Sequence, residues 1–473
     1  MEQPANRGRA DTAYDDGKLR RILLAVSLAM FLVQLDFFAL NLALPQMAHE
    51  LHVTTTDMQW AISGYMLAVG ALMIPGGRLG DILGRKRVLL AGVVLFGLAS
   101  LAAGLSDSAG MVIGFRILQG VGAALSFPVG IAALTNAFPP ERRQAAIGNA
   151  YGIAAAGTAL GPFVGGALSE VSWRWVLIFN VPLALAALVL GLTSMEESRD
   201  PSVPRTIDVK GVAAVALGIA ALTLAVDRGQ TWGWASAATL GTFATGAVLL
   251  VAFVAIERRV RFPLVELSLF RNTPYVVITL AGMVSNIAFC VTTFAVTIYL
   301  QQVRGLSPIL AGVVFLAPSL SLAIMGPLSG RIGTRYRPIG LMGTAIGAGA
   351  VGLLILSGAH AWALFVPAFA VFGAGLGFGW SYVSVATQAV VRPERAGEAS
   401  GVTLTIVVAV AGLCVATAAT VLELLEAGGA TAGEANEQLL RWTAIGALAV
   451  SVALFAFQWL GSARAPAQAE APA

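Results

Sequence analysis

Apolar stretches of about twenty residues recur from one end of the chain to the other, and they restrict its fold more than any other feature. A helix rises about 1.5 Å per residue, so each stretch can cross a hydrocarbon core roughly 30 Å thick. Only 11% of the residues are charged, whereas about 25% is typical of soluble domains. The sequence therefore predicts an all-α membrane protein without a sizeable soluble domain.

We expect fourteen transmembrane helices, because fourteen separate apolar stretches can be counted. Their ranges are 21–44, 58–77, 87–106, 111–135, 143–168, 174–193, 209–226, 236–256, 274–300, 307–329, 338–357, 361–390, 396–422 and 437–460. An even number places both ends on one side, and cytosolic ends put 24 of the 29 Lys and Arg residues in the cytosol. Because positive residues gather on that side of membrane proteins, the net charge of +4 is an orientation signal and does not indicate a nucleic-acid partner.

Two sets of residues recur at nearly constant spacing, which indicates two related halves. The residues Gly120, Gly122, Pro140, Glu141, Arg142 and Gly148 are matched 253 positions later, and Gly77, Leu79, Gly84 and Lys86 are matched 249 positions later. Repeated halves around a central site are typical of secondary transporters. The expected order is a cytosolic tail (1–20), a six-helix bundle (21–193), a cytosolic linker (194–208), an inserted two-helix hairpin (209–256), a second six-helix bundle (257–460) and a cytosolic tail (461–473).

Asp36 is the only carboxylate well inside an expected span, where it costs about 2.5 to 3.5 kcal/mol. Asp36 and Arg116 lie about 12 and 9 Å from the outer ends of their spans, so the two side chains can meet at one depth. Loss of water favours the neutral form of a carboxylate and a nearby Arg favours the charged form. The pair is therefore a candidate proton-coupling site. A static ion pair that only joins two helices is the alternative.

Six further side chains are candidates for the wall of a substrate cavity between the two bundles. They are Asn41, Gln119, Phe37, Phe38, Asn286 and Tyr299. Apolar and aromatic walls with few polar groups favour hydrophobic or amphipathic ligands. The expected partner is therefore a small molecule of that class, bound by a monomer within the lipid bilayer.

Four segments carry recognisable motifs. They are LDFFALNLALP (35–45), GRLGDILGRKR (77–87), RILQGVG (116–122) and GTALGPFVGG (157–166). Together they resemble the signatures of the major facilitator superfamily, and within it those of the fourteen-span drug:proton antiporters. The resemblance implies two six-helix bundles plus a two-helix insert. It also implies a proton-coupled exporter of small hydrophobic or amphipathic compounds such as drugs or antibiotics, working by alternating access. The chain departs from the first motif at Phe37 and Phe38, where smaller residues are usual.

The resemblance also assigns roles to two groups of residues. A cytosolic gate is implied for Gly77, Asp81, Gly84, Arg85 and Lys86, in which Asp81 accepts hydrogen bonds from a helix N-terminus or an Arg and holds the halves closed. The antiporter motif consists of Gly157, Gly161, Pro162, Gly165 and Gly166. A proline within a helix introduces a kink, and the flanking glycines allow neighbouring helices to approach closely.

Trp173-Arg174-Trp175, with Asn180 and Pro182, resembles a fingerprint of the fourteen-span families. Trp side chains also gather at the boundary between membrane and water. We accordingly expect Trp173 and Trp175 to be interfacial anchors.

Signals for phosphate or metal binding are weak. The chain has no Walker-type phosphate loop, and GAGAVG at 347–352 lies inside an expected span without a preceding strand. His49, Glu50 and His52 belong to an outer loop and are discounted as a metal site. We expect no metal, no cofactor apart from the coupling proton, and no enzymatic activity, because the spans contain no His, Ser or Cys constellation.

Arg outnumbers Lys 26 to 3, which suggests a GC-rich bacterium whose plasma (inner) membrane holds the protein. An uptake carrier for a nutrient or metal chelate is the alternative among transporters. A non-transporting receptor or membrane enzyme is the alternative outside that class.

Overall fold

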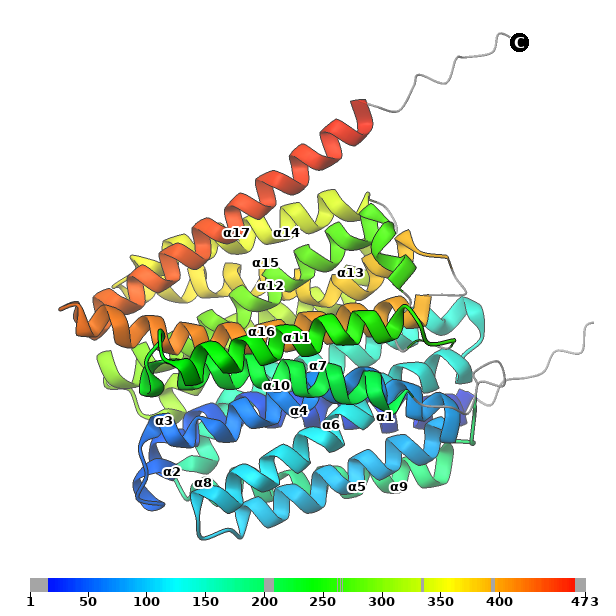
Figure 1. Cartoon of the computed structure of the whole chain (residues 1–473), viewed down its shortest axis with the longest axis horizontal. Helices are drawn as coiled ribbons and strands as arrows, with labels where there is room; N and C mark the ends of the chain where they lie inside the picture. Colours follow the sequence, from blue (N-terminus) through cyan, green and yellow to red (C-terminus); the bar gives the residue numbers. More distant parts are fainter. Residues whose placement is uncertain are drawn as a thin grey trace, which may run out of the picture.

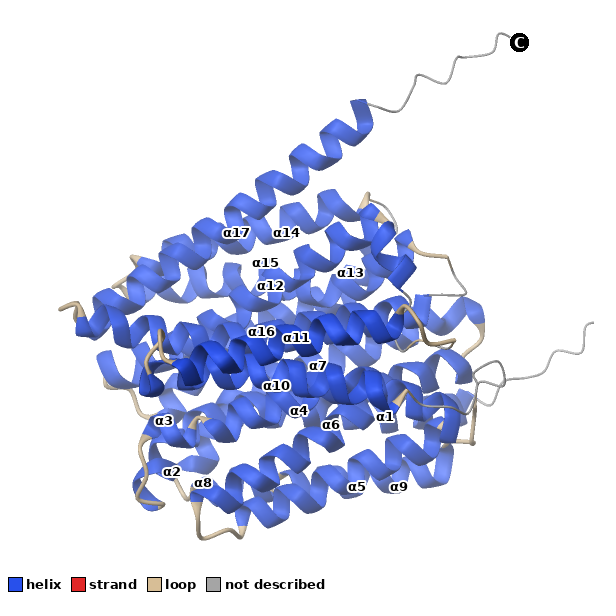
Figure 2. Cartoon of the chain, in the orientation of Figure 1, coloured by secondary structure: helices blue, strands red, loops and turns tan. Residues whose placement is uncertain are grey.

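The computed structural model describes residues 16–199, 208–332 without 262, 264 and 266, 336–392, and 396–463. Most of the expected N-terminal tail, residues 200–207 of the expected linker and residues 464–473 lie outside this range. Within it the ordered elements are helices, and no strand occurs (Figure 2). The all-α prediction is confirmed.

The first half contains the helices that precede the expected linker. They are α1 (Asp16–Ala39), η1 (Leu40–Ala43), α2 (Leu44–Glu50), α3 (Thr55–Met58), α4 (Trp60–Leu83), α5 (Arg85–Gly104), α6 (Ala109–Ala137), α7 (Pro140–Ser169), α8 (Trp173–Ile178) and α9 (Asn180–Ser194). The first expected span thus falls within the continuous helical segment from α1 through η1 to α2, in which the short 3-10 turn η1 interrupts the α-helix.

The remaining elements form the inserted hairpin and the second half. They are α10 (Val209–Trp232), α11 (Ala237–Glu257), η2 (Leu267–Arg271), α12 (Thr273–Ile298), η3 (Tyr299–Val303), α13 (Pro308–Ile332), α14 (Pro338–Ser357), α15 (Trp362–Val390), α16 (Ala396–Ala427) and α17 (Ala432–Ala463). The short π-helical turn η3 continues the C-terminal end of α12.

Thirteen helical segments of the described chain are long and apolar enough to cross a membrane. The one remaining expected span, 396–422, falls on α16. The described apolar stretch of that helix, Ala399–Val408, is shorter than a span, although α16 itself is 32 residues long. Thirteen spans thus have described counterparts of full length, and the crossing at α16 stays a prediction.

Helix packing repeats between the two halves, as the sequence repeats do. In the first half α4 and α5 pack on α6, and α1 packs on α7; in the second half α13 and α14 pack on α15, and α12 packs on α16. The halves meet where α7 packs on α13 and where α4 packs on α16, which are equivalent pairs with the halves exchanged. In Figure 1 the first half, blue to cyan, lies below the second half, yellow to red.

The inserted hairpin lies across the junction of the two halves. Helix α10 packs on both α4 and α16, while α11 packs on α10. Figure 1 shows both helices, in green, running over this junction. The hairpin therefore covers the α4–α16 seam, one of the two places where the halves meet.

Glycines of the segment 157–166 let α7 lie close to helices on two sides. Gly157, Gly161 and Gly165 face α1, and a Cβ at Gly165 would lie 2.2 Å from the carbonyl oxygen of Ala39. Gly166 faces α13, where a Cβ would lie 2.4 Å from the carbonyl oxygen of Pro308. Any larger residue at these two sites would push α7 away from α1 or from the second half.

Candidate functional site

A fully buried ion pair joins α1 to α6 inside the first half. Arg116 Nη1 donates a hydrogen bond to Asp36 Oδ2 at 2.5 Å, and neither side chain is exposed. Removing two charges from water is costly, and the cost is recovered only with good geometry and further hydrogen bonds. The structure thus brings together the two residues singled out in the sequence as a proton-coupling pair.

Uncharged side chains from two more helices complete the surroundings of Asp36. Asn180 Nδ2 on α9 donates to Asp36 Oδ1 at 2.6 Å and also lies 3.0 Å from Ser100 Oγ on α5. Ser100 Oγ donates in turn to the carbonyl oxygen of Leu177 at 2.8 Å. Both carboxylate oxygens of Asp36 are therefore bonded, one to Arg116 and one to Asn180.

Arg116 has three further partners. Nη1 donates to Gln119 Oε1 at 2.7 Å, and Nε donates to the carbonyl oxygen of Ala61 on α4 at 3.1 Å. The guanidinium also stacks over the ring of Tyr65 on α4, 4.3 Å from the ring centroid, in a cation–π contact. Helices α1, α4, α5, α6 and α9 therefore converge on one buried network around a single positive and a single negative charge.

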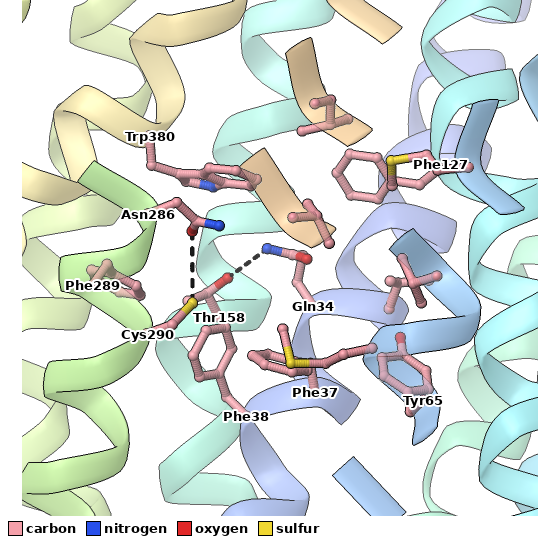
Figure 3. A pocket seen from close by; sticks show the side chains of 16 residues that line it. Gln34, Phe37, Phe38, Tyr65, Phe127, Thr158, Asn286, Phe289, Cys290 and Trp380 are labelled. Atoms are coloured by element: carbon pink, nitrogen blue, oxygen red, sulfur yellow. Dashed lines mark hydrogen bonds between the residues drawn. The ribbon is translucent and has the colours of Figure 1, made fainter. Parts of the chain in front are cut away.

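A cavity of about 660 Å³ lies between the two halves. Its wall comes from α1, α4, α6 and α7 of the first half and from α12, α15 and α16 of the second. The lining residues are Val33, Gln34, Phe37, Phe38, Tyr65, Met66, Val69, Met73, Phe127, Thr158, Asn286, Phe289, Cys290, Trp380, Leu404 and Val408. None of these is charged, and six carry aromatic rings (Figure 3).

The few polar side chains of the cavity are largely occupied by one another and by the backbone. Gln34 Nε2 donates to Thr158 Oγ1 at 3.0 Å, and Asn286 Nδ2 donates to the carbonyl oxygen of Val407 at 3.1 Å. Cys290 Sγ lies 3.7 Å from Asn286 Oδ1. Figure 3 shows these groups between the rings of the opposing helices. A wall of this kind suits an apolar, aromatic ligand held by a small number of polar contacts.

A second, smaller chamber of about 230 Å³ adjoins the first and reaches α13. Phe38, Thr158 and Phe289 line both chambers. The rings of Phe38 and Phe289 meet edge to face with centroids 6.1 Å apart, one ring from each half. This aromatic pair belongs to the wall of both chambers.

Three of the six expected cavity residues, Phe37, Phe38 and Asn286, line the cavity, and three lie elsewhere. Gln119 belongs to the ion-pair network, whereas Asn41 donates to the carbonyl oxygen of Phe37 one turn earlier. The sixth residue, Tyr299, follows the C-terminal end of α12, and its ring stacks on Phe365 with centroids 6.0 Å apart.

The segment 77–87 holds the end of α4 and the start of α5 against the chain that follows α9. Asp81 Oδ1 accepts from Nε and Nη2 of Arg85, at 3.1 and 2.9 Å. Lys86 Nζ donates to the carbonyl oxygens of Leu192 and Met195, at 3.0 and 2.6 Å. These described contacts all lie within the first half. Among them, the partner of Asp81 is Arg85 of the same motif.

Glu197 caps the N-terminus of α5. Its carboxylate accepts from the backbone N–H groups of Lys86 and Arg87, at 3.1 and 3.3 Å, where a negative charge is favoured. Gly84 precedes the helix with φ +120°, and a Cβ there would lie 2.3 Å from Glu197. Nearby, the Lys18 ammonium pairs with Glu196 and lowers the pKa of that carboxyl. The start of the expected linker is therefore fixed to the first half.

Gly77, the first residue of the expected gate, faces Pro128 of α6.

Trp173 is fully buried, so the expectation that it is an interfacial anchor is wrong. Its indole Nε1 donates to Glu50 Oε2 at 2.7 Å, and Arg174 forms an ion pair with the same carboxylate. A buried indole N–H needs a hydrogen-bond acceptor, and the Glu50 carboxylate provides one. Trp175, by contrast, is 49% exposed.

The profile of the Major Facilitator Superfamily matches residues 26–416. The chain belongs to the Major Facilitator Superfamily. The family resemblance of the sequence motifs is thereby confirmed, and the chain is a multi-pass membrane transporter.

Several relatives of this major facilitator transporter are named for drug resistance. The tetracenomycin C resistance and export protein of Streptomyces glaucescens is 37% identical over 67% of this chain and 59% of its own length. The multidrug resistance protein Stp of Mycobacterium tuberculosis is 36% identical over 80% of this chain and 71% of its own length. The puromycin resistance protein of Streptomyces alboniger is 33% identical over 80% and 77%. The chain thus spans 59% to 77% of the length of these three relatives.

A solved structure shares the fold of this transporter. A bacterial homologue of the human lysosomal transporter Spinster, crystallised in an inward-facing and unoccupied conformation, aligns with a TM-score of 0.60 and 17% identity. The alignment covers 97% of this chain and 100% of that one. The prediction of a major facilitator fold is confirmed.

Proposed function

We propose that this transporter exports small, uncharged or weakly charged compounds that are aromatic or amphipathic, such as antibiotics, in exchange for protons. The observation that carries the proposal is the cavity between the halves, whose lining contains six aromatic residues and no charged one. Met66 and Met73 add flexible apolar side chains that adapt to ligands of different shape. The names of the three relatives, which refer to antibiotic or multidrug resistance, support export of this class of compound.

Proton coupling is proposed for Asp36 and Arg116. Asp36 sits in a membrane-spanning helix, where a carboxylate is costly and is usually present for function. A proton moving inward gains about 2.3 kcal/mol per 100 mV of membrane potential and about 1.4 kcal/mol per pH unit. One proton per cycle can therefore sustain a substrate gradient of roughly a hundredfold. The protein would act in the inner membrane of a bacterium, with both termini in the cytosol.

A resistance assay tests the export of drugs. We expect that a bacterial host without its own efflux pumps, when it expresses this chain, tolerates higher concentrations of polycyclic aromatic antibiotics and of puromycin. Aminoglycosides serve as the matched negative set, because a cavity without charged side chains offers no partner for several ammonium groups. The measurement is the minimum inhibitory concentration, together with the direction of drug movement in everted vesicles. Equal tolerance of all compounds, or uptake in place of export, would contradict the proposal.

The loop around Asp81 supplies a second test. We expect Asp81→Asn to slow turnover roughly tenfold or more, since a hydrogen bond between charged groups is worth about 1.5 to 3 kcal/mol and Asp81 fixes Arg85 at the α4–α5 junction. Drug affinity should stay close to that of the unchanged protein, because the loop is remote from the cavity. Asp107→Asn, at a side chain 93% exposed, is the matched control. Unchanged turnover in Asp81→Asn would leave Asp81 without a role in the conformational cycle.

A further inference from the structure

Tyr65 is the side chain that links the buried ion pair to the cavity. Among the described residues that line the cavity, Tyr65 is the one with an interaction with Arg116. Asp36 and Arg116 do not line the cavity, so a bound compound has no direct contact with either charge. Among the described lining residues, Tyr65 is therefore the side chain through which a bound compound can act on Arg116.

The Tyr65 ring lies between Arg116 and an aromatic residue of the cavity wall. One neighbour is the Arg116 guanidinium, 4.3 Å from the ring centroid. Another is Phe37 on α1, which stacks with Tyr65 at a centroid distance of 6.3 Å and an interplanar angle of 26°. Figure 3 shows Tyr65 and Phe37 side by side at one end of the cavity. Phe37 directly follows Asp36 in the chain. Tyr65 therefore contacts Arg116 itself and the residue next to Asp36.

The Tyr65 hydroxyl is buried and has no hydrogen-bond partner among the residues that the structure describes. A buried hydroxyl without a partner is unfavourable, and Tyr is otherwise placed where its O–H can reach one. Arg116 Nη2 is likewise buried and without a hydrogen-bond partner in the described part of the chain. Because the residue lines the cavity, a polar atom of a bound compound is a suitable partner for the hydroxyl.

The backbone around Tyr65 is tightly fixed against α6. Arg116 Nε bonds the carbonyl oxygen of Ala61, one helical turn before Tyr65. A Cβ at Gly120 of α6 would lie 2.5 Å from the carbonyl oxygen of Tyr65 itself. Since α4 cannot shift here without disturbing Arg116, movement of the Tyr65 ring is transmitted to the guanidinium rather than absorbed by the backbone.

We propose that Tyr65 is a positioning residue that couples occupancy of the cavity to the Asp36–Arg116 pair, and that its hydroxyl bonds an oxygen or nitrogen atom beside an aromatic ring of the transported compound. A compound packed against the ring holds it on Arg116, which keeps Arg116 on Asp36 and favours the charged carboxylate. Linkage makes the effect reciprocal, so protonation of Asp36 weakens binding of the compound by the same factor. The inference rests on the proposed export and adds a chemical feature of the substrate.

The charged and titratable groups around this link come from three helices. They are Asp36 on α1, Arg116 on α6 and Tyr65 on α4. Helices α5 and α9 contribute Ser100 and Asn180, which are uncharged. A pH-dependent coupling is therefore carried by the carboxylate of Asp36, with Arg116 positively charged throughout.

The test uses the purified full-length protein in detergent with tetracenomycin C or puromycin as the probe. Ligand affinity is measured at pH 6 and pH 8 from quenching of Trp fluorescence, since Trp380 lines the cavity. Proton release on ligand addition is measured with a pH indicator in weak buffer. The unchanged protein should release protons and bind more tightly at the higher pH. Its failure to release protons while it binds a probe would overturn proton coupling itself, separately from the role of Tyr65.

Three variants then isolate the role of Tyr65. Tyr65→Phe keeps the ring on Arg116, so we expect normal proton release with affinity reduced about 3- to 10-fold by loss of one hydrogen bond. Tyr65→Leu should bind with affinity that differs less than about 2-fold between the two pH values, and release few protons at saturation. Phe127→Leu, which alters another ring of the wall, should weaken binding at both pH values equally. Tyr65→Met replaces Tyr65→Leu if the Leu variant is not monodisperse.

Two results would overturn the inference. One is normal proton release per bound ligand in Tyr65→Leu or Tyr65→Met, which would show that coupling bypasses this ring. The other is unchanged affinity in Tyr65→Phe for both probes, which would remove the hydroxyl from ligand recognition.

Discussion

Replacing Asp36 by Asn is expected to abolish the accumulation of drug against its gradient, because an amide cannot take up and release a proton. The roughly hundredfold gradient that one proton can sustain should fall to none, while exchange of drug down its own gradient continues. The measurement is drug accumulation in everted vesicles with an imposed pH gradient, compared with counterflow of labelled drug without one.

Asp36→Asn also leaves Arg116 charged and buried beside an amide, and loss of one member of a buried pair costs about 3 to 5 kcal/mol of stability. Thermal unfolding must therefore be followed in the same preparation, so that loss of transport is not confused with loss of folded protein. Asp57→Asn is the matched control, since Asp57 is half exposed outside the spans. Folded Asp36→Asn protein that still concentrates the drug would exclude Asp36 from proton coupling.

The large features of the fold follow from the sequence because the membrane simplifies the physics. A backbone in lipid must satisfy its own hydrogen bonds, so long apolar stretches become helices without further specification. Thirteen of the fourteen expected spans have a full-length described counterpart. The repeated residues at a spacing of 253 reappear as repeated packing, in which α6 and α15 occupy equivalent places.

The depth of a residue along its helix was also predictable, whereas its direction around the helix was not. Asp36 and Arg116 were expected at one depth, and they meet. Successive residues on a helix point about 100° apart, so Asp36 faces the interior of the first half while Phe37 lines the cavity. The expectation that Asn41 and Gln119 line the cavity is wrong, because it depends on how each helix is rotated about its axis. A helix that is apolar on all sides gives no information on that rotation.

The partners of the ion pair were missed for a related reason. Ser100 is one small polar residue in an apolar span, and such residues usually bond their own helix backbone. The sequence motifs include Asn180 only as part of a fingerprint, although an amide in an apolar helix is itself a signal that a buried polar partner exists. Tyr65 gave no sequence signal beyond its aromatic character. Its importance arises from packing between α4 and α6.

Replacement of Arg116 separates the need for a positive charge from the need for its geometry. Arg116 bonds Asp36, Gln119 and the Ala61 carbonyl at once, through two different nitrogen atoms. Lys keeps the charge but cannot reproduce this planar set of donors. We therefore expect Arg116→Lys to retain part of the uphill transport and Arg116→Ala to lose nearly all of it, as measured by drug accumulation in everted vesicles.

The pH dependence of the residual exchange in Arg116→Ala distinguishes a coupling role from a purely structural one. Arg116 is the charged group bonded to Asp36, so a coupling role means that its removal shifts the midpoint of the pH–activity profile, whereas a purely structural role leaves the midpoint in place. Gln34→Ala is the matched control, because Gln34 lies on the same helix as Asp36 but bonds Thr158 in the cavity. Its profile should keep the original midpoint. An unmoved midpoint in Arg116→Ala, even with reduced activity, would mean that Arg116 joins α1 to α6 without setting the protonation of Asp36.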